Sequence, residues 1–297
     1  MGECYFKETR RTAASRGGRR RVLVALDHIP LPLDRGEKFR NFRILEALAL
    51  RFEVGVVTLQ QEGDLAVERL ASELGLTIEW CRKLGSRAER ALRLRGVWSR
   101  MPCRAYMQRR VGLHHALVEA SSRYDAVLLE NPYGFCPGLR APLITDNHNV
   151  YAEYHRTLSK TARQLGRRLY YGLEGGKTGR YEAAMWRSSV ADVFLSRWDC
   201  ELARAFGNDP DKRVRIVPQG VEFKELPAVP DTLHRSDLFF CGNLSQPRNV
   251  DPLLEFIDRI REGIAREELS DSFKFRICGK GAPRQLLDRC DGRLIEH

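Results

Sequence analysis

The apolar run V-L-V-A-L at residues 22–26, the loop P-L-P-L-D-R-G-E-K at residues 30–38 and the helical pattern after it decide the fold of this 297-residue chain. An uninterrupted aliphatic run is typical of a strand buried on both faces of a parallel sheet. Behind the loop, Phe39, Phe42, Leu45, Leu48 and Ala49 recur at helical spacing and predict a helix with one apolar face. Strand, loop and helix in this order form the first half of a β-α-β unit.

The same alternation continues along the chain. We predict further strands at 54–59, 76–80, 126–129, 143–145, 191–195 and 214–217, and helices at 65–74, 160–187 and 198–206. Repeated β-α-β units of this kind build a right-handed, doubly wound parallel sheet. The sequence therefore predicts an α/β fold whose first domain is Rossmann-like.

A second domain begins after a break in composition. Residues 223–235 carry Pro227 and Pro230 without periodicity, which is typical of a linker. The pattern then restarts with a strand at 238–241, a helix at 250–264, a strand at 273–278 and a short helix at 284–288. Because such a domain normally has five or six strands, the second domain is predicted to be incomplete. We expect a basic tail at 1–20, a first domain at 21–222, a linker at 223–236 and a partial domain at 237–297.

Composition narrows the class of protein. Hydrophobic residues make up 43% of the chain and charged residues 30%, as in a globular protein. No apolar run approaches the ~20 residues that span a bilayer. The eight cysteines stand singly, without the pairs that hold zinc, which is typical of reduced thiols in the cytoplasm. We therefore expect a cytoplasmic protein without a metal site.

The net charge of +11 is concentrated in one segment. Residues 82–110 hold ten Lys or Arg against one acid, Glu89. An apolar stripe at helical spacing lies among them, made of Ala88, Ala91, Leu94, Trp98 and Met101. Two interpretations stand: the stripe meets an anionic membrane on the inner face of the plasma membrane, or it packs into the core while the arginines are solvated. Nucleic acid is not an expected partner, since no nucleic-acid-binding signature accompanies the charge.

Three strand ends carry candidate ligand-binding residues. In the first, Gly36 would let backbone approach a ligand, and the helix behind it offers free N–H groups to a phosphate. A tight turn without function is the alternative. In the second, D-N-H-N-V at residues 146–150, His148 could hydrogen-bond a ligand hydroxyl. The alternative is that His148 caps the following helix, although Asn149 could serve as that cap.

The third strand end opens the second domain. Gly242 follows a strand, and Arg248 can engage phosphate oxygens through its planar guanidinium. The next strand is followed by Gly279-Lys280-Gly281. Two glycine-bearing, basic strand ends side by side predict a cradle for a diphosphate.

These motifs, in this order, resemble group 4 glycosyltransferases of the two-Rossmann-domain (GT-B) type. More narrowly, they resemble bacterial sugar transferases associated with exopolysaccharide export. The matching segments are P-L-P-L-D-R-G-E-K-F-R at 30–40, D-N-H-N-V at 146–150, Y-E at 181–182, A-D-V-F-L-S at 191–196, V-P-Q-G-V-E at 217–222, F-C-G-N-L-S-Q-P-R-N-V-D at 240–251 and I-C-G-K-G-A-P at 277–283.

The resemblance implies a reaction. The first domain would bind a saccharide or lipid-linked acceptor, and the second a nucleotide-diphosphate sugar. A hexose would be transferred with retention of configuration in polysaccharide or glycolipid biosynthesis, without metal or cofactor, because basic side chains and helix N-termini stabilise the departing diphosphate. Gly36 would border the reacting centre, and His148 would contact the transferred sugar.

The resemblance also assigns binding residues. The donor side would comprise Gly242, Asn243, Arg248, Asn249, Gly279 and Gly281, and the acceptor side Arg35, Lys38, Arg40 and Asn149. Asn243 departs from the arginine that many group 4 members carry.

A second departure concerns the C-terminus. The family's Glu-x7-Glu motif would lie beyond residue 297, so the chain resembles a C-terminally truncated member from which turnover is not expected. One alternative is therefore a non-catalytic acceptor-binding or membrane-binding module that lacks the donor-site glutamates. Another is a sugar-nucleotide epimerase, which would need acidic residues in the cleft that the sequence does not identify.

Overall fold

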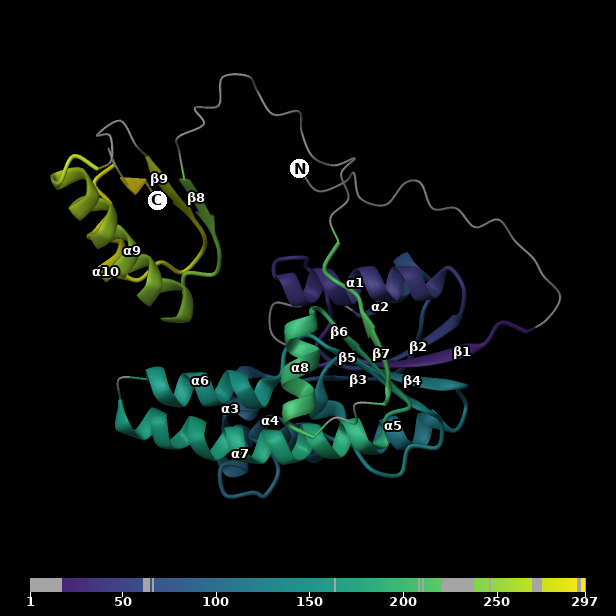
Figure 1. The fold of residues 1–297 in the computed structure, drawn as a ribbon. Coiled ribbons are helices and arrows are strands. Elements are labelled where there is room, and N and C mark those ends of the chain that lie inside the picture. The colour runs from purple at the N-terminus through teal and green to yellow at the C-terminus, as the bar shows by residue number, and fades with distance from the viewer. Residues whose placement is uncertain are drawn as a thin grey trace. The chain divides into compact units, whose positions relative to one another are not determined.

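The computed structural model describes residues 18–60, 65, 67–162, 164–207, 209, 211–220, 238–245, 247–268, 274–292 and 295–296 (Figure 1). The chain divides into two compact units, Met1–Val221 and Glu222–His297. Most of the predicted basic tail, and the whole predicted linker at 223–236, lie outside the described residues.

The first unit contains a parallel sheet of seven strands in the order β3-β2-β1-β4-β5-β6-β7. The strands are β1 (Arg21–Ala25), β2 (Glu53–Gln60), β3 (Thr77–Lys83), β4 (Ala126–Leu129), β5 (Leu143–Asn147), β6 (Ala191–Phe194) and β7 (Arg213–Ile216). The predicted strands all form, which confirms the α/β doubly wound class. The strand order reverses direction between β1 and β4, and this is the topological switch point of the sheet.

Helices cover both faces of this sheet. They are α1 (Gly36–Ala49), α2 (Val67–Leu74), α3 (Ser86–Gly96), α4 (Cys103–Val111), α5 (Leu113–Ser121), α6 (Tyr151–Thr161), α7 (Leu165–Ser188) and α8 (Arg197–Ala205), with a 3-10 turn, η1 (Pro132–Gly134). Val22 and Val24 of β1 pack with Phe42 of α1 on one face. Leu23 belongs to the core on the other face, which extends to Trp186 of α7. Figure 1 shows α1 and α2 on one side of the sheet and α4 to α7 on the opposite side.

The basic segment differs from the prediction of one continuous stripe. Helix α3 ends at Gly96, and α4 begins at Cys103 after Pro102, whose ring cannot continue a helix. A Cβ at Gly96 would lie 2.9 Å from the Cys103 Cα, so glycine permits the close return of the chain. Trp98 and Met101 therefore lie in the turn between two packed helices. Helix α5, which follows directly, had no counterpart in the prediction.

The long helix predicted at 160–187 is also two helices. The backbone is extended at Ala162 and Gln164, between α6 and α7. The two helices then pack along each other (Figure 1). A Cβ at Gly179 would lie 3.5 Å from the Ala152 Cβ, and one at Gly175 would lie 3.3 Å from the His155 Cβ. Glycine in α7 thus allows a close approach to α6, which a sequence periodicity cannot reveal.

The second unit has three parallel strands in the order β10-β9-β8. They are β8 (Leu238–Cys241), β9 (Phe275–Cys278) and β10 (Ile295–Glu296), with helices α9 (Pro247–Ala265) and α10 (Arg284–Leu287). Its core includes Leu244, Val250, Ile257, Phe275 and Ile277. Helix α9 begins three residues before the predicted 250–264, because proline suits the first helical position. Within the described residues, no helix combines the length and apolar character that a bilayer crossing requires.

Candidate functional site

Polar side chains gather where β1, β4 and β5 end, beside the switch point of the first unit. Asp27 and His28 follow β1, Glu130 follows β4, and Asp146 and His148 lie at the end of β5. All five are at most 9% exposed. Ligands of open α/β sheets bind at this edge, at the point where the strand order reverses. Two adjoining clusters can be distinguished there, one around His148 and one around Asp27.

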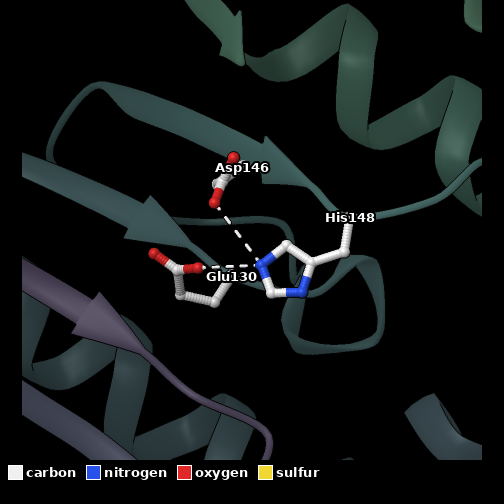
Figure 2. Close-up of side chains that lie close together, drawn as sticks. All are labelled: Glu130, Asp146 and His148. Carbon is white, nitrogen blue, oxygen red and sulfur yellow. Dashed lines mark hydrogen bonds and ion pairs between the residues drawn. The ribbon is translucent and has the colours of Figure 1, made fainter. Parts of the chain in front are cut away.

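His148 lies between two carboxylates. Its Nε2 is 3.2 Å from Glu130 Oε2 and 3.4 Å from Asp146 Oδ2 (Figure 2). Burial lowers the pKa of His148, but the hydrogen bonds and charges of Asp146 and Glu130 outweigh this effect and raise the pKa to about 9. The ring is therefore an imidazolium at neutral pH. Its Nε2–H donates to the carboxylates, and the Nδ1–H lies on the other edge of the ring.

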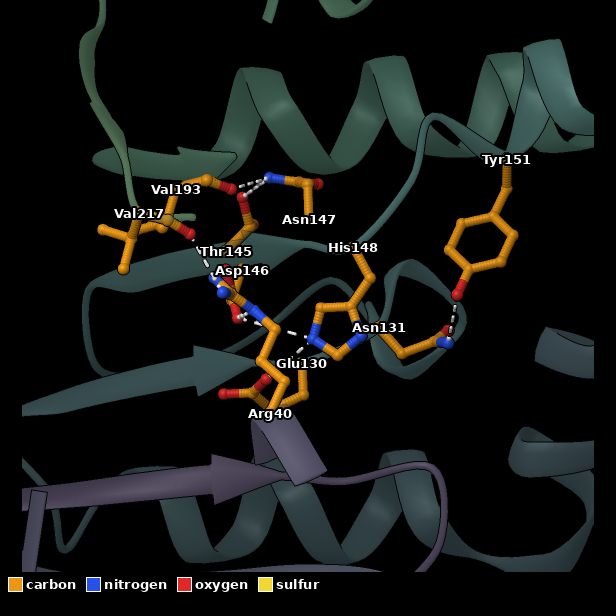
Figure 3. A network of polar contacts seen from close by, with 10 residues as sticks. All are labelled: Arg40, Glu130, Asn131, Thr145, Asp146, Asn147, His148, Tyr151, Val193 and Val217. Carbon is orange, nitrogen blue, oxygen red and sulfur yellow. Dashed lines mark hydrogen bonds and ion pairs between the residues drawn. The ribbon is translucent and has the colours of Figure 1, made fainter. Parts of the chain in front are cut away.

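Asp146 is held in place by Arg40 from α1. Arg40 Nη2 donates to Asp146 Oδ1 (2.6 Å), and Arg40 Nε donates to Oδ2 (2.8 Å), as Figure 3 shows. Arg40 Nη1 also donates to the Val217 carbonyl oxygen (2.9 Å). Burial alone would raise the pKa of Asp146, but the donors of His148 and Arg40 hold that pKa below its usual value. The guanidinium thus joins α1, β5 and the segment after β7.

Of the two carboxyl groups beside His148, Glu130 is the one that is more readily protonated. Burial raises the pKa of Glu130 to about 7, against the hydrogen bond from His148, which lowers it. Within the described part of the chain, its Oε1 has no hydrogen-bond partner. A carboxyl that titrates near neutrality can exchange a proton at the site, which an ordinary surface glutamate cannot do at that pH.

The same three side chains offer a donor set that could hold a metal ion. One ligand atom from each of Glu130, Asp146 and His148 lies within 4.8 Å of the others. A metal would, however, have to displace the proton on His148 Nε2 and compete with Arg40, which occupies both oxygens of Asp146. The arrangement fits a charge network better than a metal centre, and independence of metal stays a prediction.

Two other residues of β5, Thr145 and Asn147, point to the opposite face of the sheet and fix the strand by hydrogen bonds. Trp186 Nε1 donates to Asn147 Oδ1 (3.1 Å), and Asn147 Nδ2 donates to Thr145 Oγ1 (2.8 Å). Thr145 Oγ1 in turn donates to Asp192 Oδ1 of β6 (2.7 Å). Successive side chains of a strand point to opposite faces, so Thr145 and Asn147 face this support while Asp146 and His148 face the site.

The cap of α6 comes from a distant glutamate. Glu182 of α7 accepts hydrogen bonds from the Tyr151 N–H (2.8 Å) and the Ala152 N–H (2.9 Å). The N-cap residue of α6 is Val150, which has no capping side chain. His148 binds carboxylates instead of this helix end, and Asn149 does not cap it either, so both capping alternatives from the sequence are wrong.

Glu182 gives a testable pH dependence. Burial raises the pKa of Glu182 to about 8, although the two N–H groups act to lower it. Between about pH 4.5 and pH 8 the unfolded state loses this proton while the folded state keeps it, so folding stability falls as pH rises. Relative to wild type, Glu182→Gln should gain about 5 kcal/mol across this window, at about 1.4 kcal/mol per pH unit. Urea unfolding at a series of pH values measures the difference.

The control for this experiment is Glu153→Gln, a substitution in the same helix that Glu182 caps. Its free energy of unfolding should run parallel to that of wild type at every pH. A constant difference between wild type and Glu182→Gln would show that Glu182 is ionised throughout in the folded state.

No sequence motif predicts the second cluster. Asp27 accepts a hydrogen bond from Gln108 and forms an ion pair with Arg104, both from α4. The Arg104 guanidinium lies 5.8 Å from the centroid of the Tyr133 ring, whose centroid is 5.3 Å from that of Tyr151. A carboxylate, a guanidinium and two phenols together can bind a polar, hydroxyl-rich molecule.

His28 adds a buried imidazole next to Asp27. Both of its ring nitrogens lack a hydrogen bond within the described residues, and Nε2 lies 3.5 Å from Glu37 Oε1. Burial lowers the pKa of His28 despite the opposing charge of Asp27, so the ring is neutral at pH 7. Neither Asp27 nor Glu130 is predicted from the sequence motifs. Each of them stands directly after an apolar run that forms a strand, and this position could have identified them.

The loop residues assigned from the resemblance have mixed surroundings. Gly36 is the first residue of α1 and is exposed, and an added Cβ would meet nothing within 4 Å. Arg35 is exposed and lies 3.9 Å from Asp34, whereas Lys38 is buried, with its Nζ 3.7 Å from Asp34. Packing therefore gives no reason for glycine at position 36, which leaves the space beside the helix N-terminus open to a ligand.

Two further acceptor-side residues differ in availability. Arg40 is 5% exposed, and its guanidinium is committed to Asp146 and Val217. The structure therefore gives it the role of a clamp. Asn149 is exposed, and its side chain lies near that of Tyr151, which places it beside the Asp27 cluster.

The donor-side residues of the second unit form two loops that pack together. A Cβ at Gly279 would fall on the Gly242 carbonyl oxygen, and Gly281 has φ +79°. Asn243 Oδ1 accepts from the Ser245 N–H (3.0 Å), and Asn249 Nδ2 donates to the Asn243 carbonyl (2.9 Å). These residues thus shape the loops themselves. The Arg248 side chain lies outside what the structure describes.

No family model matches the chain, and no curated protein matches it in sequence. A similar solved structure is the apo form of the lipopolysaccharide outer core galactosyltransferase WaaB, at 10% identity and a TM-score of 0.48 over 91% of this chain. The chain spans 64% of the length of that protein.

Two other similar structures were solved with UDP. The S. aureus MnaA–UDP co-structure is 12% identical, with a TM-score of 0.48, over 93% of this chain and 67% of that chain. TcCGT1 in complex with UDP is 10% identical, with a TM-score of 0.43, over 94% of this chain and 72% of that chain.

Proposed function

We propose that this chain is part of a retaining GT-B glycosyltransferase of group 4. It would move a hexose from a nucleotide-diphosphate donor to a saccharide or lipid-linked acceptor, in polysaccharide or glycolipid biosynthesis on the cytoplasmic side of the plasma membrane. The observation that carries the proposal is the His148 imidazolium, fixed through Nε2 by Glu130 and Asp146 at the carboxyl edge of β5.

The chemistry of the site suits this reaction. With Nε2 fixed, His148 Nδ1–H can donate a hydrogen bond to a hydroxyl of the transferred sugar. A donor held by two carboxylates needs little reorganisation when the substrate binds, which is the condition for electrostatic catalysis. Glu130 and Asp146 act as positioning residues, because they contact the histidine rather than the sugar. Gly36 leaves room for the substrate to approach the backbone at the N-terminus of α1.

The two units would divide the substrates between them. In the first unit, the Asp27 cluster with Arg104, Tyr133 and Tyr151 would bind hydroxyls of the acceptor. In the second, the N-terminus of α9 offers free N–H groups and a positive dipole end to the diphosphate. Arg248, at the start of that helix, would add a charged donor to the leaving group.

A thermal shift experiment tests the proposal. The melting temperature of the purified chain should rise with millimolar UDP, GDP or one of their sugars, because a nucleotide that binds only the folded state stabilises it by mass action. Arg248→Ala should weaken that binding by about 1.5–3 kcal/mol, the value of a charged hydrogen bond. Arg259→Ala, in the same helix but paired with Glu255 at the surface, is the matched control.

The contrary outcome has a clear meaning. If a cooperatively unfolding protein shows no shift with any nucleotide, the chain is a non-catalytic module. Equal effects of the two arginine substitutions would remove Arg248 from the donor site.

A further inference from the structure

Large apolar side chains are exposed on two neighbouring elements of the first unit. In the turn after α3, Trp98 is 93% exposed, and Leu94 of α3 is also exposed. On α7, Leu165, Leu169 and Leu173 follow one another at four-residue intervals and are all exposed. At 3.6 residues per turn these three leucines form one stripe along the helix. We call these five residues the apolar patch.

Both parts of the patch point away from the protein. On α3, Leu94 lies opposite Leu92, which packs against the core, and Gly96, which is buried. On α7, the leucine stripe lies on the side opposite Glu174 and Thr178, which are buried. The exposure therefore follows from the direction in which each helix is packed.

Direct contacts place the two elements side by side. Lys177 of α7 donates to the carbonyl oxygens of Gly96 (3.3 Å) and Val97 (2.7 Å) in the turn. Glu174 accepts from the Cys103 backbone N–H (2.8 Å) at the start of α4. Leu173 lies about 40° around the helix from Lys177. The leucine stripe thus borders the turn that carries Trp98.

Basic side chains surround the patch. Arg87 and Arg90 share the outward face of α3 with Leu94, and Arg93 and Arg95 flank that face. Exposed arginines also occur beside the other parts of the patch, at Arg100, Arg167 and Arg168. The one acid of α3, Glu89, is paired with Arg93 (2.6 Å). Exposed apolar groups framed by an excess of positive charge are complementary to a surface that is apolar inside and negative outside.

We propose that the apolar patch, with the arginines around it, docks the protein on an anionic lipid bilayer. Trp98 and the leucines would enter the boundary between head groups and acyl chains, and the arginines would contact the lipid phosphates. Exposed leucines have no use in binding a phosphate backbone, which favours lipid over nucleic acid. The inference goes beyond the proposed reaction and does not depend on it.

Vesicle flotation tests the proposal directly. The full chain should float with vesicles of phosphatidylcholine containing 30% phosphatidylglycerol (a composition set at about the charge of an anionic leaflet) and bind pure phosphatidylcholine at least about tenfold more weakly. Binding should weaken as salt is added, because the charges at the surface are screened. Brominated lipids should quench the fluorescence of Trp98.

Two variants and two matched controls separate the apolar contribution to membrane binding from the electrostatic contribution. Leu94→Ser/Trp98→Ser/Leu169→Ser and Arg87→Glu/Arg90→Glu should each reduce binding to the anionic vesicles about tenfold or more. Helix α8 offers the controls, since Trp198 is 67% exposed and Arg197 and Arg204 are exposed. Trp198→Ser and Arg197→Glu/Arg204→Glu should bind as wild type does. Melting temperatures close to that of wild type show that the variants fold.

Several results would overturn the proposal. They are absence of binding to the anionic vesicles by folded protein, equal binding to both kinds of vesicle, and equal losses in the patch and α8 variants. Binding to duplex DNA without binding to vesicles would assign the basic surface to nucleic acid instead.

Discussion

Replacing Arg40 with alanine should lower the free energy of unfolding by about 3–5 kcal/mol, the cost of leaving one partner of a buried ion pair alone. Arg40 makes three hydrogen bonds, two to Asp146 and one to the Val217 carbonyl, and the pair is almost completely buried. Without the guanidinium, His148 is the charged partner that Asp146 retains among the described residues. Urea unfolding monitored by circular dichroism measures the loss.

The same helix provides the control. Arg43 lies one turn along α1 and pairs with Glu46 in a partly exposed position, so Arg43→Ala should cost less than about 1 kcal/mol. Arg40→Lys should also destabilise the protein, because an ammonium group cannot make the bidentate contact. In Arg40→Ala/Asp146→Asn, part of the loss should return, since no unpaired charge remains. Equal losses for Arg40→Ala and Arg43→Ala would contradict the clamp.

On the proposed mechanism, replacing His148 with alanine should lower kcat about 10²–10³-fold, the usual effect of removing a preorganised donor at a reacting centre. The affinity for the nucleotide donor should change much less, because the second unit is proposed to bind the diphosphate. Steady-state transfer by an active preparation of the enzyme, with nucleotide affinity measured separately, separates the two effects. His155→Ala should leave kcat nearly unchanged, because His155 lies in α6 and contacts Thr178 rather than Glu130 or Asp146.

Glu130→Gln tests whether the carboxylates act through the histidine. This change removes one of the two charges that raise the pKa of His148, so the pKa should fall from about 9 toward the ordinary value of 6.5. The alkaline limb of the pH–kcat profile should therefore move to lower pH. If Glu130 had a purely structural role, Glu130→Gln would lower the free energy of unfolding and leave the position of this limb unchanged.

The sequence predicts the sheet well and the helices on one face less well. Aliphatic runs such as the one in β1 indicate buried parallel strands, because both faces of such a strand must be apolar. The break between α3 and α4, by contrast, depends on Gly96 lying against Cys103, a tertiary contact that no periodicity encodes. The same holds for α6 and α7, whose approach depends on Gly175 and Gly179.

The candidate site was predictable in part. His148 and Asp146 stand in a conspicuous polar run after a strand, and the sequence singles out His148 for that reason. Its partner Glu130 comes from the neighbouring strand, and adjacency of β4 and β5 is a property of the sheet order. Arg40 was assigned to the acceptor, since an exposed and a buried arginine look alike in a sequence. Arg104 belongs to a helix that the prediction had merged with α3.

The pleat of β5 has an evolutionary consequence. Side chains of one short segment alternate between two roles. Thr145 and Asn147 anchor the strand to β6 and α7, while Asp146 and His148 face the site. Inserting or deleting a single residue here would exchange the two sets at once. Neighbouring codons are therefore constrained for unrelated reasons, and this segment should be the last part of the domain to diverge among descendants that keep either the fold or the chemistry.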